Sequence, residues 1–200
     1  MTQRLAAIIS RFVTGSAQSF NRQTNVDLSN KYIVLDLSEL KGKLLPVGMF
    51  IALDYVWDQI KADRTKRKAI FIDEIWQLIG ASSNRMAAEF CLEIFKVIRG
   101  FGGAAISATQ DLSDFFGLED GKYGKLILNA CRIKIVLPLE EGEARLVQQK
   151  LNLSDAETLQ IIRNRRGEGL LCIGQNRFSV AFRPTKLEYE LITTSRKDLE

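Results

Sequence analysis

The chain has 200 residues, ordinary shares of apolar and charged side chains, and a formal net charge of +4. This composition excludes wholesale disorder and allows one domain with a proper core, and the mild positive charge gives no argument for a dedicated nucleic-acid binder. The chain contains no histidine, which excludes histidine-based triads, zinc-hydrolase sites and phosphohistidine chemistry.

The cysteines and the apolar stretches indicate a cytosolic protein. Cys91, Cys131 and Cys172 are far apart, lie in apolar sequence and lack the spacing of metal ligands, so we interpret them as free thiols in a reducing compartment. No signal peptide is visible. The most apolar stretch, 44–57, contains a proline, a glycine and an aspartate and is too short to span a bilayer. Basic clusters at 64–68 and 163–166 are interpreted as solvated loop charges.

The first third of the chain alternates between helix and strand patterns. Apolar side chains at helical spacing predict a helix over 2–13, and the polar segment 14–29 is typical of a loop. The near-continuous apolar run 31–37 predicts a strand covered on both faces. A long, mostly buried helix is expected over 44–61. A second buried strand over 69–73 ends in carboxylates.

The alternation continues to the end of the chain. Ser82 or Ser83 is expected to cap the next helix and Gly100 to end it, and Ser154 with Glu157 forms a capping box. The expected elements are a helix over 83–99, a strand over 103–108, a helix over 121–129, a strand over 132–137, helices over 141–150 and from 155, and hairpin strands over 169–173 and 177–182. This order predicts an α/β fold, a mostly parallel sheet with helices on both faces and an antiparallel hairpin at one edge.

Open parallel sheets bind ligands at the carboxyl ends of their strands, where two candidate sites fall. Asp73 and Glu74 follow four apolar residues. There Asp73 could hold the water shell of a magnesium ion, and Glu74 could orient or deprotonate a water that attacks a γ-phosphate. The alternative is an acidic loop without function.

The strand over 103–108 ends in a second polar pair, Thr109 and Gln110. If this strand lies beside the first, Gln110 could reach a γ-phosphate or its attacking water, whereas alone it would begin a turn with Asp111 and Ser113. Arg99 ends the preceding helix. It could complement the helix dipole, which sequence alone favours, or act as an arginine finger on a neighbouring subunit.

Several segments together resemble the VirB-four family, the TraC- and TrbE-like ATPases of type IV secretion and conjugation, related to HerA and FtsK motors. The similarity covers nearly the whole chain, and its most specific parts are the Asp-Glu-x-Trp motif and the later Thr-Gln pair. The segments that carry it are 20–26, 35–40, 71–76, Arg99 with 107–110, and the tail 167–177.

The resemblance implies a RecA-like P-loop NTPase core that uses ATP and Mg²⁺. By it, Asp73 is the Walker B acid that holds Mg²⁺ through water, Glu74 is the catalytic base and Gln110 senses the γ-phosphate. Thr109 belongs to the nucleotide pocket, and Arg99 is the finger that acts across a homo-hexamer. The implied partners are other type IV secretion and conjugation components, with DNA as a further candidate. The implied location is cytoplasmic, peripheral to the inner face of the cell membrane.

The phosphate-binding motif Gly-x-x-x-x-Gly-Lys-Ser/Thr does not occur in the sequence. The glycine–lysine pairs at 42–43, 121–122 and 124–125 lack its other residues. In the family this loop lies upstream of the region that matches residue 1. We therefore expect residues 1–200 to form a single domain, the C-terminal portion of a RecA-like ATPase domain. Alone, this chain should be inactive and bind ATP weakly or not at all.

The function implied by the resemblance is that of a motor fragment, whose complete protein couples ATP hydrolysis to substrate transport or pilus assembly. One alternative is a fragment of a HerA- or FtsK-like DNA-translocating ATPase, which shares the order of motifs. Another is a non-catalytic interaction scaffold that docks partners through 44–61 or the terminal hairpin.

Overall fold

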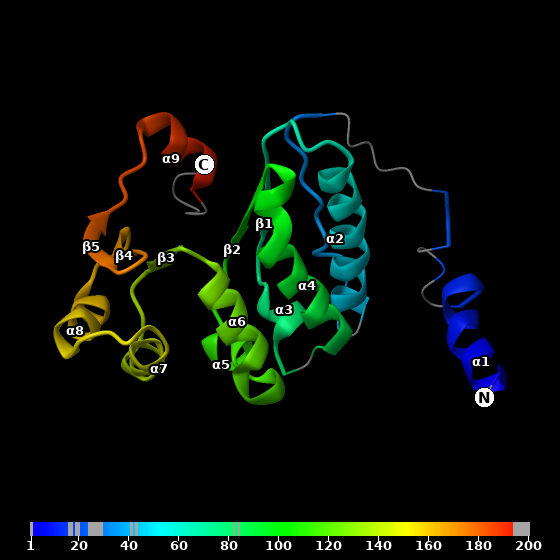
Figure 1. The fold of residues 1–200 in the computed structure, drawn as a ribbon, viewed down its shortest axis with the longest axis horizontal. Helices are drawn as coiled ribbons and strands as arrows, with labels where there is room; N and C mark the ends of the chain where they lie inside the picture. The colour runs from blue at the N-terminus through cyan, green and yellow to red at the C-terminus, as the bar shows by residue number, and fades with distance from the viewer. Residues whose placement is uncertain are drawn as a thin grey trace. The chain divides into compact units, whose positions relative to one another are not determined.

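The computed structural model describes residues 2–15, 18, 21–23, 30–40, 42, 44–81, 83 and 85–193 (Figure 1). The chain divides into two compact units, Met1–Ala62 and Asp63–Glu200. Lys43, Ser82 and part of the segment 20–26 lie outside the described residues. That the 200 residues form a single domain stays a prediction.

Among its described residues, the first unit has helices at the predicted positions, α1 (Thr2–Val13) and α2 (Leu44–Ala62). Pro46 lies in the first turn of α2, where backbone N–H groups have no partner within the helix in any case. The buried residues of α2 are Gly48, Leu53, Trp57 and Ile60, and the last three share one face of the helix. None of the helices in the described part of the chain has the length and apolar character needed to cross a membrane.

The segment 31–37 is not the buried strand that its apolar run predicted. Residues 33–37 belong to no helix or strand, and the side chains of Tyr32 and Val34 are 84% and 71% exposed. A strand forms only where a neighbouring strand takes up its backbone N–H and C=O groups. No described residue pairs with this segment, so its apolar composition alone does not make it a strand.

The second unit begins with a parallel pair of strands, β1 (Lys68–Ile72) and β2 (Gly103–Ser107). Between them the chain forms the short helix α3 (Trp76–Ile79) and the helix α4 (Arg85–Val97), as Figure 1 shows. Ile70 and Ile72 are buried, but Phe71 is 72% exposed. The expectation of a strand covered on both faces is therefore wrong for β1, which buries only one face among the described residues.

Helix α4 fills the core with one side, as its sequence predicted. Its buried residues are Ala87, Ala88, Cys91, Leu92, Ile94 and Phe95. The helix ends at Val97 and a 3₁₀ turn, η2, continues over Ile98–Phe101. Gly102 ends this turn with φ 73°, in the left-handed region that favours glycine. The α-helix is therefore two residues shorter than the predicted helix, which ran to Arg99, and Gly102 rather than Gly100 ends the 3₁₀ turn that continues it.

The chain then forms three short elements, α5 (Leu112–Phe115), η3 (Leu118–Gly121) and α6 (Lys122–Ala130). They are followed by an antiparallel sheet in the order β3-β4-β5, with strands Ile133–Val136, Glu168–Ile173 and Asn176–Ala181. The α/β class and the C-terminal hairpin are confirmed. However, β3 pairs antiparallel with β4 rather than joining the parallel pair.

Two helices, α7 (Glu141–Leu151) and α8 (Asp155–Arg163), share a core with this antiparallel sheet. The core brings together residues of α7, α8, β3 and β4 with one residue between the helices: Val136, Ala144, Val147, Leu153, Ile161, Leu170 and Cys172. Burial in this core raises the pKa of the Cys172 thiol, so the group stays protonated, in agreement with a free, structural cysteine.

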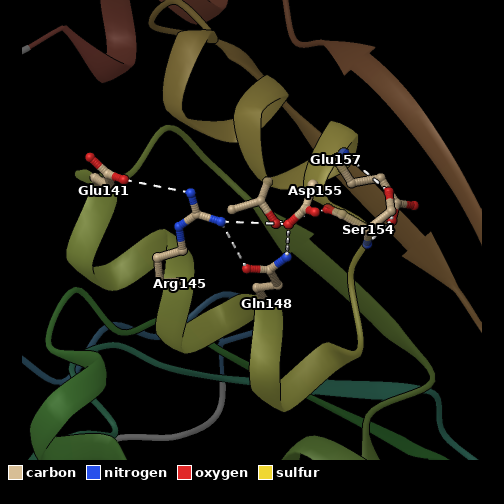
Figure 2. Close-up of polar contacts among 7 residues, drawn as sticks. Glu141, Arg145, Gln148, Ser154, Asp155 and Glu157 are labelled. Carbon is tan, nitrogen blue, oxygen red and sulfur yellow. Dashed lines mark hydrogen bonds and ion pairs between the residues drawn. The ribbon is translucent and has the colours of Figure 1, made fainter.

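Polar contacts define the corner between α7 and α8 (Figure 2). Arg145 lies 3.6 Å from Glu141 on its own helix and 3.6 Å from Asp155 at the start of α8, and Gln148 donates to Asp155 at 2.8 Å. Ion pairs between exposed side chains contribute little to stability. These contacts therefore add little to the stability of the corner, which rests on the shared apolar core.

The capping box at the start of α8 forms as predicted. The Ser154 hydroxyl accepts from the Glu157 backbone, and the Glu157 carboxylate accepts from the Ser154 N–H at 2.7 Å. The backbone and hydroxyl donors of Ser154 lower the pKa of Glu157. This stabilisation is present at neutral pH and is lost as the pH falls through the lowered pKa.

A last helix, α9 (Lys186–Ile192), was not predicted, although Thr185 and Glu188 form a second capping box. The helix has no buried residue. Leu187 and Leu191 are 67% and 77% exposed. The capping box is visible in the sequence, but the segment is only 7 residues long and has no buried stripe, so no helix was predicted there.

The two capping boxes allow a matched test. We expect Ser154→Ala to lower the free energy of unfolding by about 1 kcal/mol, because α8 contributes Thr158 and Ile161 to the interior. Thr185→Ala should leave it unchanged, because α9 buries nothing. Urea unfolding followed by circular dichroism measures both values. Equal losses for the two variants would contradict this account of α9.

A second matched pair tests the turn before β2. A Cβ at Gly102 would lie 2.9 Å from the carbonyl oxygens of Arg64 and Lys66, and its φ is positive, whereas a Cβ at Gly100 meets nothing within 4 Å. We expect Gly102→Ala to lower the free energy of unfolding by about 2 kcal/mol. Gly100→Ala should change it by less than about 0.5 kcal/mol. A destabilised Gly100→Ala variant would place the essential glycine where the sequence had suggested.

Candidate active site

The loops that follow β1 and β2 lie side by side because the two strands are parallel and in register. Ile72 pairs with Ser107 at their carboxyl ends. Beyond that pair, the N–H of Ala108 donates to the carbonyl of Ile72 at 3.0 Å, and the N–H of Ile75 donates to the carbonyl of Ala108 at 3.2 Å. Glu74 lies between Ile72 and Ile75, and Gln110 follows Ala108. The two backbone contacts therefore bring the side chains of Glu74 and Gln110 close together.

Glu74 is held by hydrogen bonds to both carboxylate oxygens. The amide Nε2 of Gln110 donates to its Oε1 at 2.6 Å, and the indole Nε1 of Trp76 donates to its Oε2 at 2.6 Å. The backbone of Glu74 has φ 50°, an uncommon conformation for a residue with a side chain. Backbone strain of this kind is concentrated at functional sites. The predicted base and the predicted sensor are therefore in direct contact.

Asp73 precedes Glu74 and is exposed. Its Oδ1 accepts the backbone N–H of Glu74 at 3.0 Å, which fixes the direction of the carboxylate. Among the described residues there is no group of three or more side chains that could enclose a metal ion. A single exposed carboxylate suits Mg²⁺, which prefers oxygen ligands and keeps most of its water. The residues present thus fit an ion held through water.

Thr109 and Gln110 lie between β2 and α5. The hydroxyl of Thr109 donates to the carbonyl of Asp111 at 3.2 Å, and Asp111 caps α5 by accepting the N–H of Asp114 at 2.8 Å. Gln110 lies directly before this cap and also contacts Glu74.

Arg99 is not part of this cluster. It is exposed and lies in η2, just before the amino end of β2, whereas Glu74 and Gln110 follow the carboxyl ends. Five strand residues separate the two ends, about 16 Å at 3.3 Å per residue. The guanidinium of Arg64 lies 4.4 Å from the ring centre of Phe101 at the same end. Within one chain, Arg99 cannot reach the acids.

Trp76 is the site residue whose role sequence reasoning missed. In the Asp-Glu-x-Trp motif the two acids were assigned chemical roles, whereas the tryptophan contributed only to the family resemblance. A local signal for the role of Trp76 exists, because an indole N–H two residues after a carboxylate, at the start of a helix, is within reach of that carboxylate. The neighbours Ile75, Leu78 and Ile79 are almost fully buried and anchor the short helix α3.

Comparison with known proteins assigns the chain to a family. The family model of the TraG P-loop domain matches residues 5–169, so the chain belongs to the TraG P-loop domain family. No curated protein matches the sequence.

Among solved structures, the chain is similar to VirB4 of Thermoanaerobacter pseudethanolicus, with a TM-score of 0.85, 26% sequence identity and coverage of 93% of this chain. The chain spans about half of that structure, 50% of its length. Two structures of the genome packaging NTPase B204 from Sulfolobus turreted icosahedral virus 2 align over 66% and 74% of this chain and 62% and 65% of theirs, at 14% and 13% identity, with TM-scores of 0.47 and 0.49. The predicted resemblance to the VirB-four family and the RecA-like α/β fold are thus confirmed.

Proposed function

We propose that this chain forms the acid-and-sensor half of the ATP-hydrolysing site of a type IV secretion motor. The observation that carries the proposal is the contact between Glu74 and Gln110, which joins the carboxyl ends of two neighbouring parallel strands. Membership of the TraG P-loop domain family and the likeness to VirB4 support the same conclusion.

In this proposal each side chain has one task in hydrolysis. A water molecule gives a proton to a carboxylate oxygen of Glu74 while its oxygen bonds to the γ-phosphorus. The bond from that phosphorus to the bridging oxygen breaks, and ADP keeps the electron pair. Asp73 holds the water shell of Mg²⁺, which neutralises charge on the phosphates. Gln110 donates to a γ-phosphate oxygen, and Thr109 lines the pocket beside it.

A phosphate-binding loop is the missing half, and we propose that a segment outside residues 1–200 supplies it. The described part of the chain leaves room for such a segment in the sheet, because β2 pairs only with β1 and β3 pairs only with β4. A further parallel strand on the free edge of β2 would end beside Glu74 and Gln110. Its following loop would then bring backbone N–H groups to the triphosphate.

Arg99 then fits a role between subunits. Because it lies about 16 Å from the acids of its own chain, it could serve hydrolysis only on the nucleotide of a neighbour. This is the arrangement of a homo-hexamer with sites at the subunit contacts. The complete protein would work at the cytoplasmic face of the inner membrane with other secretion or conjugation components, and couple hydrolysis to substrate transport or pilus assembly.

Two other functions remain as alternatives with distinct consequences. A HerA- or FtsK-like DNA translocase would use the same acids but show ATPase activity stimulated by DNA. A non-catalytic scaffold would keep the fold and bind partners without hydrolysis. The hydrogen bonds from Gln110 and Trp76 to Glu74 favour catalysis, since they orient a carboxylate that a scaffold would not use.

The proposal predicts how ATP binding depends on the missing loop. A fluorescent ATP analogue with Mg²⁺ should bind tightly to the protein extended upstream through its phosphate-binding loop, and weakly or not at all to residues 1–200. In the extended protein, Glu74→Gln should lower kcat by at least about 100-fold without weakening ATP binding. Glu93→Gln, at an exposed acid of α4, is the matched control and should keep full activity.

Tight binding of the analogue by residues 1–200 alone would show that the nucleotide site lies elsewhere. An active Glu74→Gln variant would remove the assigned base. In either case the proposed roles of Asp73, Glu74 and Gln110 would fall.

A further inference from the structure

The two hydrogen-bond donors that hold Glu74 differ in how firmly they are fixed. Trp76 is the first residue of α3, its carbonyl accepts the N–H of Gly80 at 2.7 Å, and the flanking Ile75 and Leu78 are almost fully buried. Gln110 is exposed and lies in the loop between β2 and α5. One oxygen of Glu74 is thus held by an anchored group and the other by a side chain that is free to turn.

The chemistry of the two donors differs as well. An indole N–H donates but cannot accept, so it orients the charged carboxylate and never takes a proton from it. A glutamine amide donates equally well to a carboxylate or to a phosphate oxygen. The oxygen that Gln110 holds, Oε1, is therefore the one that a competing phosphate could release.

From this geometry we propose that Trp76 is a positioning residue for Glu74, and that Gln110 is an exchangeable latch on its other oxygen. Trp76 fixes Oε2 at all times. Gln110 occupies Oε1 in the nucleotide-free protein and moves to the γ-phosphate when ATP binds, which leaves Oε1 to accept the proton of the attacking water. This inference rests on the proposed function. It adds a role for Trp76 and the order in which Gln110 leaves Glu74 and Glu74 accepts the proton of the attacking water.

The backbone of Glu74 supports a fixed role for the first donor. Its φ of 50° is unfavourable for glutamate, and the contact of Ile75 with Ala108 at 3.2 Å holds the turn in that conformation. With the backbone of the turn fixed, the carboxylate can still rotate about the side-chain bonds of Glu74. A hydrogen bond from the anchored indole of Trp76 restricts this rotation.

The contact between Trp76 and Glu74 can be tested without nucleotide. The chain has two tryptophans, so its ¹H–¹⁵N spectrum should contain two indole signals, which Trp76→Phe assigns. We expect the Trp76 signal to shift in Glu74→Gln, while the Trp57 signal serves as the internal control. A Trp76 signal that is the same in Glu74→Gln and in the wild type would overturn the proposal.

Kinetics of the extended protein then separate positioning from structure. Trp76→Phe keeps an aromatic ring and removes the N–H. We expect kcat to fall about tenfold or more with KM for ATP unchanged. Trp57→Phe leaves the contact with Glu74 in place and should keep the kcat of the wild type.

The latch has its own readout. On addition of a non-hydrolysable ATP analogue and Mg²⁺ to the extended protein, the side-chain amide signal of Gln110 should shift, and Glu74→Gln should leave that shift in place. An amide signal of Gln110 that does not respond to bound nucleotide would overturn the latch.

The outcomes distinguish this inference from the function on which it rests. If Glu74→Gln abolishes hydrolysis but Trp76→Phe leaves kcat unchanged, the positioning role is wrong and the proposed function stands. If the extended wild-type protein hydrolyses no ATP, both are wrong.

Discussion

The parallel pairing of β1 with β2 is the constraint on which the candidate site depends. Glu74 and Gln110 are 36 positions apart in the sequence, and only the register that places Ile72 opposite Ser107 brings them within hydrogen-bonding distance. Because side chains alternate along a strand, a slip of one residue would turn Ile70 and Ile72 out of the core. The burial of these two isoleucines and the geometry of the site are therefore fixed by the same pairing.

The part of the site that local sequence determines was the easier part to predict. The acids follow four apolar residues, and a strand that ends in polar residues is recognisable from pattern alone. The helices α1, α2, α6, α7 and α8 were predicted for similar reasons, by periodicity or by a capping box. The proximity of Gln110 to Glu74 required one further assumption, that consecutive parallel strands are neighbours, which the structure has.

The predictions that failed concern contacts that no local pattern encodes. The segment 31–37 has the composition of a strand, but among the described residues nothing pairs with it. The segment 133–136 is a strand, as expected, yet β4, a strand some thirty positions later, determines its direction and sheet. The glycine that ends the helical segment of α4 and η2 was misplaced because Gly100 and Gly102 look alike in sequence. The positive φ of Gly102 and the nearby carbonyls of Arg64 and Lys66 tell them apart.

The described residues already hold the acid and the sensor in contact, although the sequence contains no phosphate-binding motif. The pairing of β1 with β2 and the core side of α4 are internal to the second unit, so Glu74, Trp76 and Gln110 need no nucleotide to take their places. In the proposed mechanism such a site is preorganised but latched. Its reactivity then depends on whether a phosphate draws Gln110 away from Glu74.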